Sequence, residues 1–144
     1  MIDIKQVHKS FGNREILKGI DLHVPTGSVT VILGPSGSGK TTFLRTLNFL
    51  EKADAGTMQL NDISVDLHKA SNKEILNARR NTSMVFQSYN LFSNKTVIEN
   101  IMEGLVTVKK MKKSQAREIA QRFLKEVGME GYDDYYPVQL SGGQ

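Results

Sequence analysis

Residues 34–41 read Gly-Pro-Ser-Gly-Ser-Gly-Lys-Thr and match the pattern G-x-x-x-x-G-K-[ST]. The apolar run before them, residues 28–33, is typical of a short buried strand, and residues 41–50 carry apolar side chains at helical spacing. The motif is therefore predicted to lie in a turn between a strand and a helix. This order of elements favours an α/β fold.

A loop of this composition is suited to holding phosphate. Glycines let the backbone turn its N–H groups inward around an anion, which then rests on the N-terminus of the following helix. Lys40 is predicted to reach the β and γ phosphates, and the hydroxyl of Thr41 to ligate Mg²⁺, which prefers oxygen donors. The alternative is an ordinary glycine-rich turn, which would match the pattern in roughly one chain in two hundred of this length.

The composition is that of one globular domain, with 39% hydrophobic and 24% charged residues among 144. The absence of cysteine excludes disulfides and thiolate metal sites. No apolar run approaches the roughly 20 residues that span a bilayer, and no leader-like segment opens the chain. We therefore expect a cytoplasmic protein that could still lie against a membrane.

Positive charge is concentrated in one part of the chain. The net charge is +4, and four lysines lie close together at Lys109, Lys110, Lys112 and Lys113. A solvated face is favoured over a patch for acidic lipid or nucleic acid. No aromatic residues alternate with these lysines, as a base-stacking surface would require.

Alternating apolar residues predict two β-hairpins. Residues 2–4 and 20–24 alternate apolar and polar side chains on either side of a Gly-Asn turn. Residues 57–60 and 63–65 form a second, smaller pair around Asn-Asp. The first pair is expected to lead into the strand at residues 28–33.

The rest of the chain is predicted to be mainly helical. A short helix is expected at residues 73–80, a strand at 82–86 and a helix at 96–105. A last helix should begin after Ser114 as its N-cap and end at Gly128. Its apolar stripe is predicted to pack into the core and consists of Ala116, Ile119, Ala120, Phe123, Leu124 and Val127.

A second motif identifies the family that the chain resembles. Residues 140–144 spell LSGGQ, the signature sequence of ABC-type ATPases, and five fixed residues arise by chance roughly once in five thousand such chains. Residues 85–87 (Val-Phe-Gln) resemble the strand leading into the family's Q-loop. Residues 10–12 (Ser-Phe-Gly) resemble the A-loop, whose aromatic ring stacks on adenine. The resemblance covers the whole chain.

The local sequence is similar to the ATPase subunits of bacterial polar amino acid importers, notably Asn-Leu-Phe at 90–92 and Val-Ile-Glu-Asn at 97–100. Three positions depart from the usual pattern. Phe11 stands where tyrosine is common, Ser93 where proline often follows Leu-Phe, and residues 53–55 lack a frequent proline. Phe11 keeps a ring face for stacking, so the departures bear on the substrate class rather than on the ATPase identity.

The resemblance implies a P-loop NTPase (RecA-like) core with an N-terminal antiparallel β subdomain and part of the ABC helical subdomain, truncated at the signature motif. It places residues 1–95 in the β subdomain and core, and 96–144 in the helical subdomain. It implies catalytic roles for Lys40 and Gln87, and Mg²⁺ binding by Thr41 and Gln87. The residues implied to bind ATP are Phe11, Gly34, Pro35, Ser36, Gly37, Ser38, Gly39, Lys40, Thr41, Thr42, Ser141, Gly142, Gly143 and Gln144.

The same resemblance implies partners. Two ATPase subunits would pair head to tail, so that the signature of one copy covers the γ-phosphate held by Lys40 of the other. Transmembrane permease subunits, and indirectly an extracytoplasmic binding protein, would complete the assembly, with the ATPase peripheral on the cytoplasmic face of the membrane. Movement of the loop at Gln87 would carry the closing motion to the permease. No nucleic acid is expected.

The family's hydrolytic glutamate and Walker B aspartate follow the signature, and no residue of this chain can be matched to them. We therefore interpret the chain as the N-terminal part of a longer protein, which binds nucleotide without turning ATP over. Two other hypotheses stay open. One is a soluble ABC-type ATPase acting on ribosomes or DNA, a class that usually carries a second cassette or a coiled-coil insertion. The other is a nucleotide-binding fragment without catalytic function.

Overall fold

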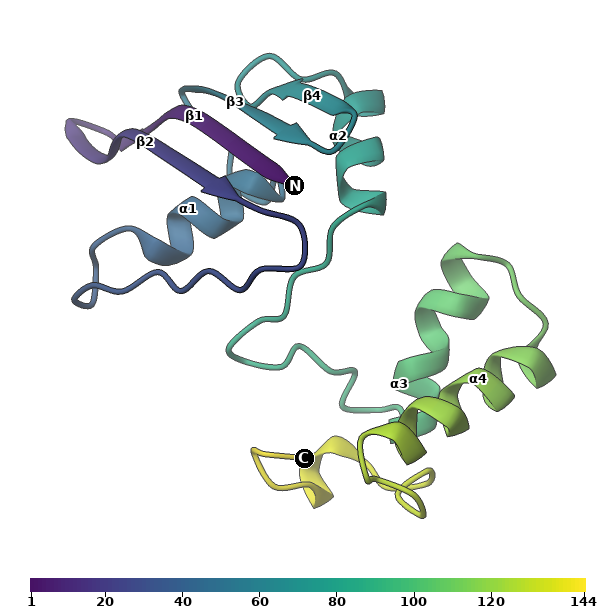
Figure 1. The fold of residues 1–144 in the computed structure, drawn as a ribbon. Coiled ribbons are helices and arrows are strands. Elements are labelled where there is room, and N and C mark those ends of the chain that lie inside the picture. Colours follow the sequence, from purple (N-terminus) through teal and green to yellow (C-terminus); the bar gives the residue numbers. More distant parts are fainter. The chain divides into compact units, whose positions relative to one another are not determined.

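The computed structural model describes residues 1–144 and contains two compact units, Met1–Val85 (the N-terminal unit) and Phe86–Gln144 (the C-terminal unit). Each unit has its own elements, strands and helices in the first and helices in the second (Figure 1). This mixture of strands and helices agrees with the predicted α/β class. The predicted subdomain boundary between residues 95 and 96 stays a prediction.

The N-terminal unit is built on one antiparallel sheet of four strands, in the order β2-β1-β3-β4 (Figure 1). Its strands are β1 (Ile2–Phe11), β2 (Arg14–Val24), β3 (Ala55–Leu60) and β4 (Ile63–Asp66). β1 pairs with β2 and β3 with β4 across short turns, which confirms both predicted hairpins. β1 also pairs with β3, so the first hairpin is continuous with the second.

Two helices complete the core of this unit. Helix α1 (Lys40–Leu47) contributes the buried Phe43, and helix α2 (Asn72–Arg80) contributes the buried Ala78. Both side chains belong to one apolar cluster with residues of β1 and β3, such as Ile4. Helix α1 ends before the predicted residue 50, because Phe49 adopts a left-handed conformation with φ of 56° that a helix cannot continue through.

The central strands approach each other closely at Gly56. Its φ is +124°, and a Cβ atom there would lie 2.8 Å from the Cα of Val7 in β1. Only glycine combines this backbone conformation with so short a distance between chains. The sheet therefore packs tightly near the middle of β1.

Two predicted strands are absent from the structure. Residues 28–33 and 82–86 are irregular, because neither segment has a hydrogen-bonded partner among residues 1–144. Several of their apolar side chains are correspondingly uncovered, with Val29 91%, Val31 71% and Val85 91% exposed, whereas Ile32 packs against the core. The strand predictions are wrong for this chain, because a short apolar run indicates a tendency to be extended and does not supply the neighbour that makes a strand.

The C-terminal unit consists of helices and irregular segments. Helix α3 (Val97–Glu103) continues into a π-helix, η1 (Gly104–Val108), and is followed by α4 (Lys113–Glu126) and a short 3₁₀ helix, η2 (Pro137–Gln139). The helix predicted at 96–105 is confirmed as α3. Its start is set by a capping box, in which the Thr96 hydroxyl and the Glu99 carboxylate each accept the other residue's backbone N–H.

Helix α4 differs from its prediction in two respects. Its N-cap is Lys112 rather than Ser114, and no side chain caps it. Only Ala116, Ala120 and Leu124 are buried, because they recur every fourth residue on the face that packs against α3. Phe123 (44% exposed) and Val127 (68% exposed) lie outside this face. The C-terminal prediction was close, since Gly128 follows the helix with φ of +71°.

Candidate functional site

The loop at residues 34–41 leads into helix α1, as the sequence predicts, whereas no strand directly precedes it. Gly39 is the N-cap of α1, with φ of 94°, and no side chain caps the helix. A Cβ at Gly39 would lie 2.8 Å from Ile16 Cγ2, so a larger residue fits neither the space nor the backbone conformation. The first backbone N–H groups of α1 are consequently left to an external acceptor.

The side chain of Lys40 lies across this loop. Its ammonium group donates hydrogen bonds to the carbonyl oxygens of Gly34 at 2.8 Å and Pro35 at 2.7 Å. The loop is thus folded around the positive charge of Lys40. Phosphate oxygens are stronger acceptors for an ammonium group than neutral carbonyls, so the same donors are suited to a polyphosphate.

The remaining loop positions are open to solvent. Ser36, Gly37 and Ser38 are exposed, and so is Thr41 in the first turn of α1. Mg²⁺ in nucleotide sites is held by one or two protein oxygens together with phosphate oxygens and waters. The exposed hydroxyl of Thr41, next to Lys40, fits that requirement. No cluster of three or more His, Cys, Asp or Glu side chains offers an all-protein metal site.

A cleft of about 450 Å³ extends from this loop along the N-terminal unit. The loop residues Gly34, Pro35, Ser38, Gly39 and Lys40 line one part of it. The rest is lined mainly by apolar residues of β2, α1 and the segment 30–33, together with Asp21 and Thr30. The polar part is suited to a phosphate group, because it contains the Lys40 ammonium and the N-terminus of α1. The apolar part is suited to packing against protein, because it offers few hydrogen-bonding groups.

Phe11 stands at the end of β1, where the sequence predicts an adenine-stacking ring. The side chain is 49% exposed. The ammonium group of Lys9 lies 4.9 Å from its ring centre. Lys9 is a residue that sequence reasoning missed, although its position two residues after the buried Val7 indicates that it shares the inward face of β1.

Gln87 and the signature residues belong to the C-terminal unit. Gln87 is exposed, and the backbone turns sharply after it, since Tyr89 and Asn90 have φ of 60° and 53°. Asn100 of α3 fastens the chain that follows: its side-chain oxygen accepts the N–H of Phe92 at 2.8 Å. Its amide nitrogen also donates to the carbonyl oxygens of Phe92, Lys95 and Thr96. Sequence reasoning missed this role of Asn100.

Residues 141–144 form a tight, exposed turn. The backbone N–H of Ser141 donates to Gln144 Oε1 at 2.9 Å, and the N–H of Gln144 donates to the carbonyl oxygen of Ser141 at 3.1 Å. A Cβ at Gly142 would lie 3.0 Å from the Tyr89 hydroxyl oxygen. The two glycines therefore leave their backbone groups accessible, and Gly142 also makes room for Tyr89.

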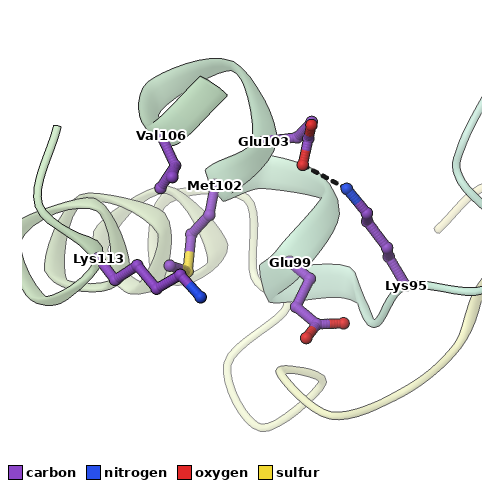
Figure 2. Close-up of a pocket in the computed structure, with 6 residues that line it drawn as sticks. All are labelled: Lys95, Glu99, Met102, Glu103, Val106 and Lys113. Atoms are coloured by element: carbon purple, nitrogen blue, oxygen red, sulfur yellow. Dashed lines mark hydrogen bonds and ion pairs between the residues drawn. The ribbon is translucent and has the colours of Figure 1, made fainter. Parts of the chain in front are cut away.

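The C-terminal unit holds a separate cleft of about 240 Å³ between α3, η1 and the start of α4 (Figure 2). Lys95 pairs with Glu103 there, and hydrogen bonds from Lys95 and then Thr107 hold the pKa of Glu103 below its ordinary value. Glu99 accepts the Thr96 N–H at 2.9 Å. Both carboxylates are engaged within the chain, and none of the predicted site residues lines this cleft.

The predicted site residues are therefore divided between the two units. The loop at 34–41 and Phe11 lie in the N-terminal unit, whereas Gln87 and residues 141–144 lie in the C-terminal unit. No helix in the structure has the length and apolar character needed to cross a bilayer.

Comparison with known proteins gives consistent matches. The profile of the ABC transporter family matches residues 17–144. The L-cystine import ATP-binding protein TcyN of Bacillus subtilis is 51% identical over all 144 residues, which span 56% of that protein. The arginine transport ATP-binding protein ArgV of Corynebacterium glutamicum is 48% identical, again over the whole chain and 59% of the relative.

Two solved structures that match are of an ATP-binding cassette. The dimeric structure of MJ0796, a bacterial ABC transporter cassette, superposes with a TM-score of 0.83 and 32% identity, over all of this chain and 65% of that one. A post-hydrolysis state of the same cassette, bound to ADP and Pi, matches with the same TM-score and 31% identity. The chain thus spans somewhat over half the length of the curated relatives it matches.

Proposed function

The chain belongs to the ABC transporter family, and from this premise we propose that it forms the nucleotide-gripping part of an ATPase subunit that energises import of polar amino acids. The observation that carries the proposal is the arrangement at the start of α1. There an uncapped helix N-terminus and the Lys40 ammonium converge on one exposed loop. Positive charge and free N–H donors directed at the same point are what a polyphosphate requires.

Each residue of the loop has a separate task in this proposal. The backbone N–H groups of residues 37–41 surround the phosphates, and Lys40 exchanges its contacts with Gly34 and Pro35 for the β and γ phosphates. Thr41 would hold Mg²⁺ by its hydroxyl, whereas the role of Gln87 in Mg²⁺ binding stays a prediction from the family resemblance. Bound Mg²⁺ would supply charge neutralisation for phosphoryl transfer, which depends mainly on positioning and electrostatic stabilisation.

The signature turn acts in the sister copy of a head-to-tail pair. Ser141, Gly142 and Gly143 are exposed, and the two glycines leave backbone N–H groups free to approach a γ-phosphate. The phosphate would join the two subunits, and its removal by hydrolysis would release them. The dimeric arrangement of the matching MJ0796 cassette supports this part of the proposal.

The transported class follows from the names of the relatives, which are ATP-binding proteins for cystine and arginine transport. We propose permease subunits as direct partners and an extracytoplasmic binding protein as an indirect one. The subunit would lie peripherally on the cytoplasmic face of the membrane. The names also favour transport over the alternative of a soluble ATPase acting on ribosomes or DNA.

Titration with Mg-ATP tests the proposal. Lys40→Ala should weaken binding by about tenfold or more, because it removes charge-assisted hydrogen bonds to the phosphates. Lys18→Ala is a matched control, since Lys18 is exposed on β2 and lies outside the loop. Equal Mg-ATP affinity of the wild type and Lys40→Ala would contradict the proposal.

We also propose that these 144 residues bind nucleotide without turning it over, because none of them can be matched to the hydrolytic glutamate that the family resemblance implies. Steady-state phosphate release from this polypeptide should equal that of Lys40→Ala. Turnover clearly above that variant would show that the base lies within the chain.

A further inference from the structure

Lys9 is a charged side chain in the interior of the N-terminal unit. The residue is only 9% exposed. Its ammonium group donates to the carbonyl oxygen of Lys52 at 2.7 Å and pairs with Glu51 Oε1 at 2.9 Å, with Asp54 Oδ1 further away at 3.9 Å. A buried lysine of this kind is held in one place, because each lost contact would leave a charge unpaired in the interior.

The fixed ammonium lies over one face of Phe11. Its nitrogen is 4.9 Å from the ring centre, within the range of a cation–π contact. Half of the Phe11 side chain nevertheless remains exposed. The cation therefore occupies one face of the ring and leaves the opposite face for another planar group.

The backbone around this pair is tied to the same segment. The N–H of Ser10 donates to Asp54 Oδ2 at 2.6 Å, and the N–H of Asp54 donates to the carbonyl oxygen of His8 at 2.9 Å. Residues 8–11 are thus fastened to residues 51–54 on both sides of Lys9. The end of β1, and Phe11 with it, has little freedom to move.

We propose that Lys9 is a positioning residue for nucleotide recognition, which holds the Phe11 ring so that its free face stacks on the purine base of ATP. This inference rests on the proposed function, since it presupposes that nucleotide binds to the neighbouring loop. A flexible aromatic side chain must be ordered when a ligand binds, and a ring already held in place avoids that entropic cost. Lys9 acts through Phe11 and touches no phosphate.

A purely structural role for Lys9 makes a different prediction. If the side chain served only to hold the fold together, its loss would disturb the phosphate loop and the base-binding region alike. If it positions Phe11, its loss should weaken only those ligands that carry a base. Mg-ATP and magnesium tripolyphosphate separate the two cases, because they share the phosphates and differ in the nucleoside.

The test is calorimetric titration of the complete protein with both ligands. Lys9→Met should bind Mg-ATP about three- to tenfold more weakly and tripolyphosphate unchanged, the range expected from loss of one preordered contact. Phe11→Ala should weaken ATP binding more strongly. Adding Lys9→Met to Phe11→Ala should not weaken Mg-ATP binding further, because the ring through which Lys9 acts has already been removed. Lys5→Met is the matched control, because Lys5 lies on the same strand with its side chain 68% exposed.

Several outcomes would overturn the inference. Unchanged ATP affinity in Lys9→Met, equal losses for both ligands, additive effects in the double variant, or no effect of Phe11→Ala would each do so. If Lys9→Met does not fold, Lys9→Gln keeps a donor for the Lys52 carbonyl and carries the same comparison. If the wild type binds neither ligand, the proposed function itself fails. If it binds both and only the Lys9 prediction is wrong, the inference fails alone.

Discussion

The strand β1 and the segment 28–33 both contain apolar residues suited to a strand, but their surroundings differ. Both carry several apolar residues, yet Ile4 and Val7 of β1 are 1% and 0% exposed, whereas Val29 and Leu33 are 91% and 85% exposed. β1 has a hydrogen-bonded neighbour on each side, and the segment 28–33 has none. The difference teaches that, of two apolar extended segments, the one with partner strands is buried more completely, although Ile32 of the unpaired segment still packs against the core.

Amide hydrogen exchange should show the largest effect. We expect the paired amides of β1 to be protected about a thousandfold or more over those of residues 28–33, because exchange at the paired amides requires opening of the sheet. The comparison is made within one spectrum of the 144-residue chain. Similar protection in the two segments would mean that 28–33 has found a partner in solution.

Truncation of one side chain in each region should give the next largest difference. Ile4→Ala should lower the free energy of unfolding by about 2–5 kcal/mol, because it leaves a cavity in the core. Val31→Ala should change it by less than about 0.5 kcal/mol, because Val31 is 71% exposed. Urea denaturation measures both. A comparable loss in the two variants would contradict the exposure of Val31.

Glycine substitutions sharpen the contrast further. Gly56→Ala and Gly27→Ala both place a side chain at positive φ, which costs about 1–2 kcal/mol. Only Gly56 has neighbours in the way, since nothing lies within 4 Å of a Cβ at Gly27. We expect the Gly56 variant to be less stable by about a further 1–3 kcal/mol. Equal thermal stabilities would argue against the close approach of β1 and β3.

The smallest effect should come from Asp66, at the end of the paired strand β4. Hydrogen bonds from the backbone N–H groups of Lys69 and then His68 lower the pKa of its carboxyl. A lowered folded-state pKa stabilises the fold above the ordinary pKa of aspartate, and this contribution is lost as the pH falls through the lowered value. The stability advantage of the wild type over Asp66→Asn should therefore disappear in acid. Thermal melts at several pH values measure it, and a pH-independent difference would contradict the assignment.

Local signals predicted local structure well. The turns at 12–13 and 61–62 lie where glycine, asparagine and aspartate indicate them, and both hairpins were predicted correctly. The capping box at Thr96 and Glu99 similarly accounts for the start of α3. These features depend on residues close together in the chain, so a short stretch of sequence contains all the interactions that decide them.

Positions that depend on distant residues were predicted less well. Lys9 can be buried because its ammonium group binds the carbonyl oxygen of Lys52 and the carboxylate of Glu51, which lie over forty residues further along the chain. The prediction of a strand at 82–86 was wrong for the same reason, because the sequence of this segment does not show whether another strand lies beside it. The apolar stripe of α4 predicted that Phe123 is buried, but this residue is 44% exposed. The width of the buried face depends on the helix that packs against it, which the stripe does not show.

The order of residues alone determined which chemical groups this chain carries, since the glycine-rich loop with Lys40 and Thr41 and the residues at 141–144 are read directly from the sequence. Tertiary structure alone decided which apolar segments are covered and which charge lies beneath the Phe11 ring. The reason is physical, because backbone conformation and turn chemistry are local energies, whereas burial and charge pairing depend on what the folded chain brings into contact.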